Sequence, residues 1–182
     1  ETQGLYSKAE PLYLRSLAIL EKVLGAEHPE TATAQNNLGR LHQLQGLYSK
    51  AEPLYLRSLA IREKVLGAEH NATAVALANL ANFYSGQGLY GKAEPLYLRS
   101  LAILEKVFSG DHPLTATVLN NLGILYQYER LYGKAEPLYL RSLVIREKVL
   151  GAEHTDTAMS LNNLGWLYTS QGLFGKAEPL FL

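Results

Sequence analysis

Histidines that each follow an acidic residue recur along the chain and are its first candidates for chemistry. They are His28, His70, His112 and His154, preceded by Glu27, Glu69, Asp111 and Glu153. A histidine beside a carboxylate could ligate a metal ion or act as a general base. Consecutive histidines are 42 residues apart, and stacked helical units would place them on the order of 10 Å apart, too far to share a metal ion. We therefore expect each histidine to stabilise its own turn through a hydrogen bond to the backbone.

A second chemical motif lies at residues 86–92, which fit the phosphate-loop pattern G-x-x-x-x-G-K. Ala93 stands where that loop needs a Ser or Thr to hold magnesium, and no strand pattern precedes it. Few residues could form a catalytic site, because Cys is absent and no Ser–His–acid set breaks the repeat symmetry. We expect no enzymatic activity, no cofactor and no metal site.

Composition restricts the possible partners. The 182 residues include 17 Lys and Arg and 17 Asp and Glu, so the formal net charge is zero. A protein that binds nucleic acid or an anionic membrane needs a surplus of basic over acidic residues. This chain has no such surplus, so we expect neither as a partner. The absence of Cys excludes disulfides and suits a reducing compartment, and no apolar run reaches membrane-spanning length. We expect a cytoplasmic protein, and the missing initiator Met suggests a fragment of a longer chain.

An internal repeat predicts the elements that would position any site. The string Gly-Leu-Tyr/Phe, then Ser/Gly-Lys-Ala-Glu-Pro-Leu, recurs every 42 residues, with its aromatic residue at Tyr6, Tyr48, Tyr90, Tyr132 and Phe174. A period of this length predicts a stack of supersecondary units. We expect a single array over 1–182: a partial repeat 1–28 (second helix only), repeats 29–70, 71–112 and 113–154, and a truncated repeat 155–182.

Each period contains two helical patterns and no strand pattern, which predicts an all-α fold. The first helix is expected from Thr31 to Leu44, with Thr31 as its N-cap and Gly46 ending it. The second is expected to open with a capping box at residues 49–52 and to end at Gly67.

The repeats depend on their neighbours for stability. The apolar stripe of one helix pair cannot offset the backbone entropy of a 42-residue unit, which is on the order of 40–80 kcal/mol. The partial units at the two ends have no polar capping helix. We therefore expect exposed apolar ends that stack head-to-tail between molecules.

Several residues of the repeat resemble the tetratricopeptide motif. They are Asn37, Leu38, Gly39, His42, Gly46, Tyr48, Ala51, Tyr55 and Ser58. Its 42-residue length and the strings Arg-Ser-Leu-Ala-Ile and Glu-Lys-Val-Leu-Gly are similar to kinesin light chains, and most to near-identical arrays of bacterial, especially cyanobacterial, kinesin-light-chain-like proteins. The resemblance implies a right-handed α-solenoid of antiparallel helix pairs. The heptad segment that joins true light chains to the motor is missing, so the motor role is not implied.

The resemblance also implies that the first helix of each repeat lines a concave groove. The expected groove residues are Asn37, Asn79, Asn121 and Asn163, with Asn36, Asn120 and Asn162 alongside. One helical turn further come Arg40, Asn82, Ile124 and Trp166, then Gln43, Ser85, Gln127 and Thr169. An amide offers both a donor and an acceptor to a peptide unit, which suits binding of an extended peptide or a partner helix.

Alternatives remain open for these residues. The Asn series could bond only between adjacent first helices, and Trp166 could either anchor a ligand or shield the truncated last unit. A chaperone-tail receptor is disfavoured because the expected Lys is absent, and acidic peptides should bind weakly because only Arg40 adds clear charge. The competing function is a structural spacer or self-assembling scaffold without a specific ligand.

Overall fold

Nine α-helices and a final 3₁₀ turn make up the part of the chain that the computed structural model describes, residues 2–180. In order they are α1 (Thr2–Val23), α2 (Pro29–Leu44), α3 (Tyr48–Leu66), α4 (Asn71–Ser85), α5 (Tyr90–Phe108), α6 (Pro113–Tyr128), α7 (Tyr132–Leu150), α8 (Thr155–Ser170), α9 (Phe174–Ala177) and η1 (Glu178–Leu180). No strand occurs among these residues, so the all-α prediction is confirmed. The helices form two compact units, residues 1–87 and residues 88–182.

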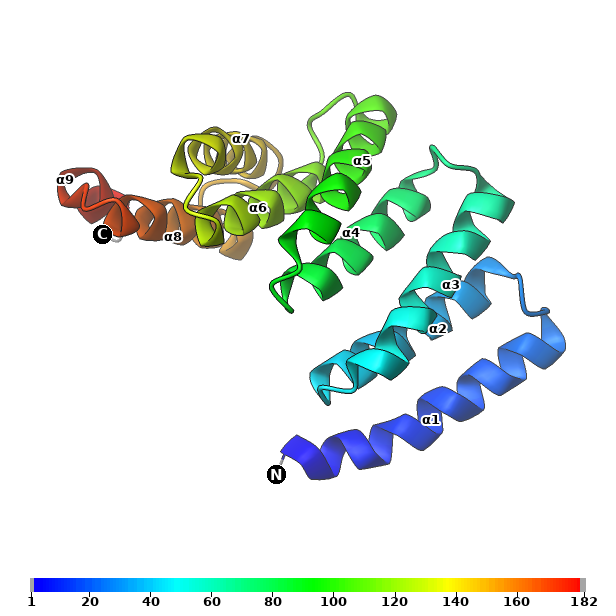
Figure 1. Ribbon diagram of the computed structural model, residues 1–182. Helices are drawn as coiled ribbons and strands as arrows, with labels where there is room; N and C mark the ends of the chain where they lie inside the picture. The colour runs from blue at the N-terminus through cyan, green and yellow to red at the C-terminus, as the bar shows by residue number, and fades with distance from the viewer. Residues whose placement is uncertain (1, 181–182) are drawn as a thin grey trace. The chain divides into compact units, whose positions relative to one another are not determined.

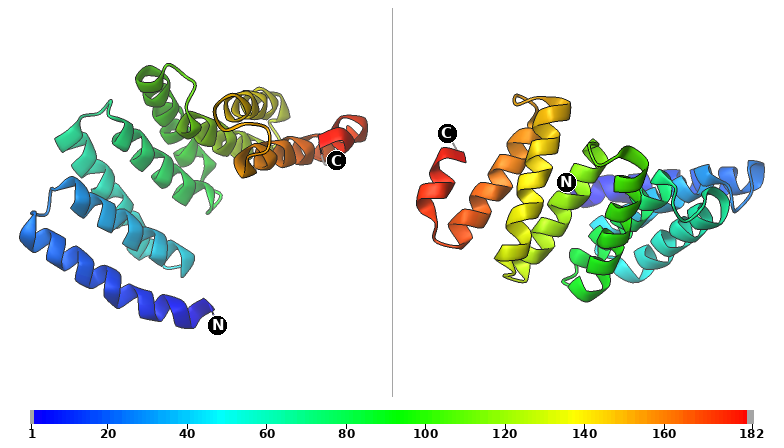
Figure 2. Two further views of the ribbon diagram at one scale, coloured as in Figure 1. Left: turned by 180° about the vertical axis from the view of Figure 1, so that it is seen from behind. Right: turned by 90° about the horizontal axis from the view of Figure 1, so that it is seen from above.

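Within each unit, consecutive helices pack against one another as antiparallel neighbours (Figure 1). In unit 1, α2 packs against both α1 and α3, and α3 packs against α4. In unit 2, α6 packs against α5 and α7, while α8 packs against α7 and the short α9; the views in Figure 2 show the same order. Every helix therefore has its main contacts with helices adjacent in sequence, as a solenoid of repeats requires.

A histidine caps each of the four first helices, α2, α4, α6 and α8. The Nδ1 atom of His28 accepts a hydrogen bond from the backbone N–H of Glu30 at 3.2 Å. His70, His112 and His154 make the equivalent bond at 3.1 Å. The expectation that these histidines stabilise their turns is confirmed. The prediction of Thr31 as N-cap is wrong, because the helix begins at Pro29 and the Thr31 hydroxyl donates to the Gly25 carbonyl at 2.8 Å.

The turn between the two helices of a repeat is set by its glycine. Gly46 has a φ of +73°, and the N–H groups of Leu47 and Gly46 donate to the carbonyls of His42 (2.8 Å) and Gln43 (3.0 Å). This is a Schellman motif, which satisfies the last carbonyls of α2. The capping box predicted at residues 49–52 is wrong, because α3 already begins at Tyr48 and the Leu47 carbonyl accepts its first backbone bonds.

Small residues allow the two helices of a repeat to approach closely. A Cβ added to Gly39 would lie 3.3 Å from the Cβ of Leu54 and 3.4 Å from the Ala51 carbonyl oxygen. The buried Ser58 hydroxyl donates to the carbonyl of Ala32 across the same interface at 2.7 Å. The sequence therefore fixes the spacing of α2 and α3 through residues without bulky side chains.

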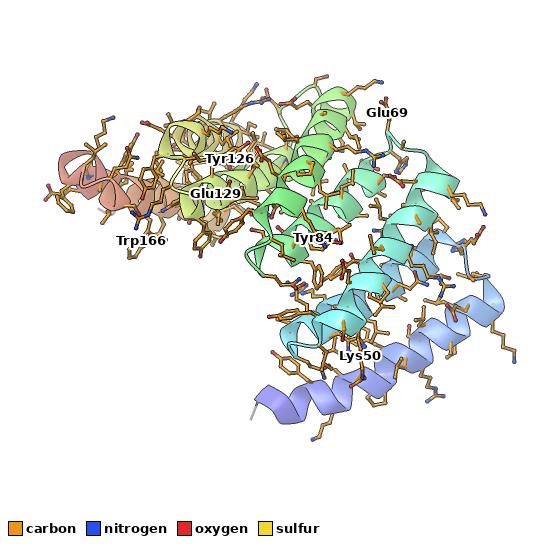
Figure 3. All side chains as sticks on the ribbon, viewed as in Figure 1. Lys50, Glu69, Tyr84, Tyr126, Glu129 and Trp166 are labelled. Carbon is orange, nitrogen blue, oxygen red and sulfur yellow. The ribbon has the colours of Figure 1, made fainter. Side chains whose placement is uncertain are left out.

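A tyrosine on each later first helix links it to the preceding repeat. The hydroxyl of Tyr126 on α6 donates to a carboxylate oxygen of Glu94 on α5 at 2.6 Å, and Tyr84 on α4 bonds Glu52 on α3 at 2.7 Å (Figure 3). Burial, the hydrogen bond and the negative charge of the carboxylate raise the pKa of both tyrosines to about 12. These phenols stay neutral and bonded at neutral pH.

Candidate functional site

Unit 1 has a groove of about 330 Å³ between its first helices. Its lining residues are Asn36, Asn37, Arg40, Gln43 and Leu44 on α2, Tyr55 on α3, and Asn79 and Asn82 on α4. Helix α2 supplies most of the residues that line this groove. Its predicted groove residues recur every three to four positions, which places them on one face of the helix.

Unit 2 has a larger groove of about 540 Å³. It is lined by Ile124, Gln127 and Tyr128 on α6, Arg130 in the turn, Tyr132 and Tyr139 on α7, and Asn162, Asn163, Trp166 and Ser170 on α8. Six of these residues lie 84 positions, or two repeats, after a residue that lines the groove of unit 1. The two openings are therefore the same groove built on different copies of the repeat.

A buried tyrosine forms the floor of each groove. The Tyr55 hydroxyl donates to the Gln43 side-chain oxygen at 2.7 Å, and Tyr139 donates to Gln127 at 2.8 Å. Burial raises the pKa of Tyr55 to about 12, against a smaller opposing effect of the Arg40 charge, and burial likewise raises the pKa of Tyr139. Both floors therefore present a neutral aromatic ring whose hydroxyl is already bonded.

The asparagines of adjacent first helices bond to one another. The Asn79 amide nitrogen donates to the Asn36 side-chain oxygen at 3.1 Å, and Asn163 donates to Asn120 at 2.9 Å. The structural alternative for the Asn series thus applies to these two pairs, although Asn36, Asn79 and Asn163 also line the grooves. Asn121, half-buried on α6, is not among the lining residues of either groove.

The two grooves differ in chemistry at three equivalent positions. Unit 1 has Arg40, Leu44 and Asn82, whereas unit 2 has Ile124, Tyr128 and Trp166. Tyr128 is 67% exposed and Trp166 is 56% exposed on α8 (Figure 3). At these positions the first groove is polar and carries the Arg40 charge, whereas the second offers broad aromatic surfaces in a groove that Arg130 also lines.

Several lining residues were not predicted from the sequence. Leu44, Tyr55, Tyr128, Arg130, Tyr132, Tyr139 and Ser170 are the additional ones. Broken repeat symmetry was the signal that could have identified some of them, because Arg130 replaces the turn glycine of the other copies and has a φ of +59°. The position of Tyr55 and Tyr139 is a tyrosine in four consecutive copies, so broken symmetry could not single these two out.

Other kinds of site find no support in the described residues. Residues 2–180 contain no group of three or more His, Asp or Glu side chains arranged to hold a metal ion. None of the helices described combines the length and the apolar character needed to cross a bilayer.

A family model, the tetratricopeptide repeat, matches residues 1–64, 41–106, 72–132 and 126–182. The chain belongs to the tetratricopeptide repeat family. A search of the curated proteins found no match.

Solved structures of kinesin-light-chain-like proteins are similar to the chain. BtubC (BKLC) from P. vanneervenii is 27% identical, with a TM-score of 0.83 over 98% of this chain and 71% of that one. A candidate kinesin light chain from Podosopora anserina with nearly identical TPR-like repeats is 28% identical, with a TM-score of 0.79 over 99% of this chain and 85% of that one. These matches confirm the predicted solenoid class and the light-chain-like type of repeat.

Proposed function

We propose that this tetratricopeptide repeat chain is a non-catalytic interaction module whose grooves hold an extended peptide or a partner helix. Its family is typical of protein–protein interaction scaffolds. The proposal places the binding surface on the predicted Asn-containing faces of the first helices and places the protein in the cytoplasm.

One observation carries the proposal: the equivalent grooves of the two units expose aromatic, amide and cationic side chains to a ligand. Trp166 and Tyr128 are more than half exposed, and Asn37 and Arg40 are exposed in unit 1. Large aromatic side chains at a concave surface are typical anchors of protein interfaces.

Each groove suits a different kind of ligand group. In unit 1, exposed amides and the Arg40 guanidinium can bond to peptide carbonyls and N–H groups, with one positive charge available for an acidic group. In unit 2, Trp166 and Tyr128 can cover a large apolar side chain and exclude water from it. We therefore expect ligands with an aromatic or aliphatic anchor residue and few charges.

A displayed library of random peptides, selected on the 182-residue chain, tests this function. Selected peptides should share a large apolar residue, and Trp166→Asn, which introduces the unit 1 residue, should weaken their binding at least about thirtyfold. Met159→Asn is the matched control, because Met159 lies on the same helix and is 55% exposed but lines neither groove. Selection that enriches no peptide, or equal losses for both variants, would refute groove recognition.

A self-assembling scaffold is the second candidate, and the exposed face of α1 favours it. Leu12 is 68% exposed, Ile19 is 51% exposed and Val23 is 71% exposed on this single helix. Such a contiguous apolar surface is typical of an association site.

A further inference from the structure

Four aromatic side chains line the groove of unit 2. They are Tyr128 on α6, Tyr132 and Tyr139 on α7, and Trp166 on α8. The Tyr128 ring packs parallel to the ring of Tyr90 on α5, with 6.2 Å between the ring centroids and an interplanar angle of 9°. Tyrosine and tryptophan have few rotatable bonds, so a ligand that packs against these rings immobilises little conformational freedom. The groove therefore provides preorganised aromatic surfaces.

The polar side chains of this groove offer more hydrogen-bond donors than acceptors. The Gln127 side-chain oxygen already accepts from Tyr139, and the Gln127 amide nitrogen donates to the Ser170 hydroxyl at 3.3 Å. The Ser170 hydroxyl in turn donates to the Trp166 carbonyl at 2.8 Å. The Trp166 indole and the Arg130 guanidinium can only donate. A ligand that presents carbonyl oxygens and few N–H groups therefore complements the groove.

Arg130 lines the same groove at the expense of backbone strain. Its φ is +59°, whereas the equivalent residues Gly46, Gly88 and Gly172 are glycines with a φ of +73°. A non-glycine residue with a left-handed φ is strained, and such strain often marks a functional site. Arg130 is exposed and is the one charged side chain among the lining residues of this groove. Its charge favours an acidic over a basic residue in the ligand.

We propose that the groove of unit 2 binds a proline-rich segment in the polyproline II conformation, with an acidic residue beside Arg130. This deepens the groove recognition proposed above and rests on it. Proline lacks a backbone N–H but keeps its carbonyl, so a run of prolines presents acceptors to the donors of this groove. A polyproline II helix has no internal hydrogen bonds and docks in aromatic-lined grooves, where its preformed backbone loses little entropy on binding.

The positions of the aromatic rings predict the spacing of the prolines. Tyr128 and Trp166 lie on α6 and α8, which contact each other, and the axes of neighbouring helices are about 8–10 Å apart. In polyproline II, residues i and i+3 lie on one side and about 9 Å apart, since each residue advances by about 3.1 Å. A Pro-x-x-Pro segment that crosses from α6 to α8 can therefore place one proline on each ring. The side-chain oxygens of Asn162 and Asn163 remain for the N–H groups of the intervening residues.

The groove of unit 1 serves as an internal comparison. Its floor is equivalent, because the Tyr55 hydroxyl donates to Gln43. Leu44 and Asn82 stand in place of the two exposed aromatic residues, and Gly46 stands in place of the arginine. We therefore expect the chain to bind one proline-rich segment and not two.

Isothermal titration calorimetry of the full 182-residue chain tests this ligand class. The probe is a synthetic peptide with blocked ends and the sequence Glu-Pro-Ala-Ala-Pro-Glu, which should bind with a stoichiometry of one. Its analogue with Ala in place of both prolines should bind at least about tenfold more weakly. Tyr128→Leu and Trp166→Asn, which introduce the unit 1 residues, should each weaken binding of the proline peptide by a similar factor. Met159→Asn is the control and should bind like the wild type, and circular dichroism verifies that each variant is folded.

Exchanging both Glu residues of the peptide for Lys isolates the contribution of Arg130. The Lys peptide should bind the wild type about tenfold more weakly at low salt, because it brings like charges together. Arg130→Gly should reduce the difference between the two peptides to less than about twofold. The glycine relieves the strained φ, so this variant keeps its fold. An unchanged preference for Glu in Arg130→Gly would overturn the role of Arg130.

Transfer of the two rings to unit 1 tests whether they carry the recognition. Leu44→Tyr combined with Asn82→Trp should raise the stoichiometry from one to two peptides per chain. A stoichiometry of one in this folded variant would overturn the assignment of recognition to the two rings.

The ligand class can fail while groove recognition stands. Equal binding of the proline peptide and its alanine analogue would overturn the proposal. Random-library selection that enriches peptides without proline, whose binding depends on Trp166, would also overturn it but would leave groove recognition intact. Selection that enriches no peptide would refute both.

Discussion

The buried Arg146 offers a quantitative test of how the repeats pack. Arg146 on α7 is 4% exposed, and its Nη1 atom donates to the Ser160 hydroxyl at 2.8 Å and the Asp156 carbonyl at 2.9 Å, both on α8. Its buried Nε atom has no hydrogen-bond partner among the described residues, and burial lowers its pKa. One repeat earlier, the equivalent residues are the buried Leu104 and Val118.

Replacing Arg146 and Ser160 by Leu and Val, the residues of the preceding repeat, should reveal the energetic coupling between the two polar side chains. Ser160→Val alone leaves the guanidinium short of an acceptor and should lower the free energy of unfolding by about 1.5–3 kcal/mol. Arg146→Leu alone should change it by less than about 1 kcal/mol, because the lost bonds and the relieved desolvation largely cancel. The double variant should match or exceed the wild type in free energy of unfolding, which gives a coupling of at least about 1.5–3 kcal/mol if Arg146→Leu alone changes little.

Urea unfolding, followed by circular dichroism and by the fluorescence of Trp166, measures these free energies. Trp166 is the only tryptophan and lies on α8, so it reports on the altered interface, and coincident curves verify two-state unfolding. Arg62→Leu with Ala76→Val is the matched control, since Arg62 bonds Thr33 on α2 and the equivalent of Ser160 is Ala76. Additivity in the Arg146 cycle, or a loss above about 3 kcal/mol for Arg146→Leu, would refute the reasoning.

Three further changes have expected outcomes. Gln35 is 0% exposed, and no described residue bonds its side-chain amide. The equivalent residue two repeats later is Leu119. Because Gln35→Leu removes a buried polar group without a partner, it should raise the free energy of unfolding, measured by urea titration, by about 1–3 kcal/mol. Arg130→Gly should raise the free energy of unfolding by about 1 kcal/mol, because glycine adopts the φ of +59° at this position without strain. A lower urea midpoint for this variant would contradict the prediction. The pKa of Tyr126, raised from 10.0 to about 12 by burial and Glu94, favours the neutral phenol in the fold. The neutral Tyr126 phenol contributes its full stabilisation of the fold below about pH 10, and this contribution is lost as the pH rises toward 12. The melting temperature of the wild type should therefore fall over that range. The fall should be smaller in Tyr126→Phe.

Prediction from the sequence was strongest for features that the repeat multiplies. The 42-residue period, the glycine turn at Gly46 and the histidine bonds recur in several copies, so chance agreement is small. The N-cap at Thr31 and the capping box at 49–52 failed for a local reason. Thr and Ser are favoured caps, but His28 caps α2 instead. Helix α3 begins at Tyr48, directly after the Schellman turn of α2, and its N-cap residue Leu47 makes no side-chain capping bond.

The candidate site was predicted less completely. Asn36, Arg40 and Trp166 line the grooves as helix periodicity predicts, because it fixes which residues share a face. Their role in binding a ligand stays a prediction. Bonding between asparagines of adjacent first helices was one of two alternatives from the sequence. Which asparagines pair was not predictable, since the Asn79–Asn36 bond depends on the distance between two helices separated by a third.

The sequence by itself determined the repeat, the helices and the glycine turns, because these follow from local residue types and their period. Only the tertiary structure decided which amides bond to each other and which tyrosines form the groove floors. Nearly identical repeats have the same local preferences, so the differences among them arise from which neighbouring helices each one contacts.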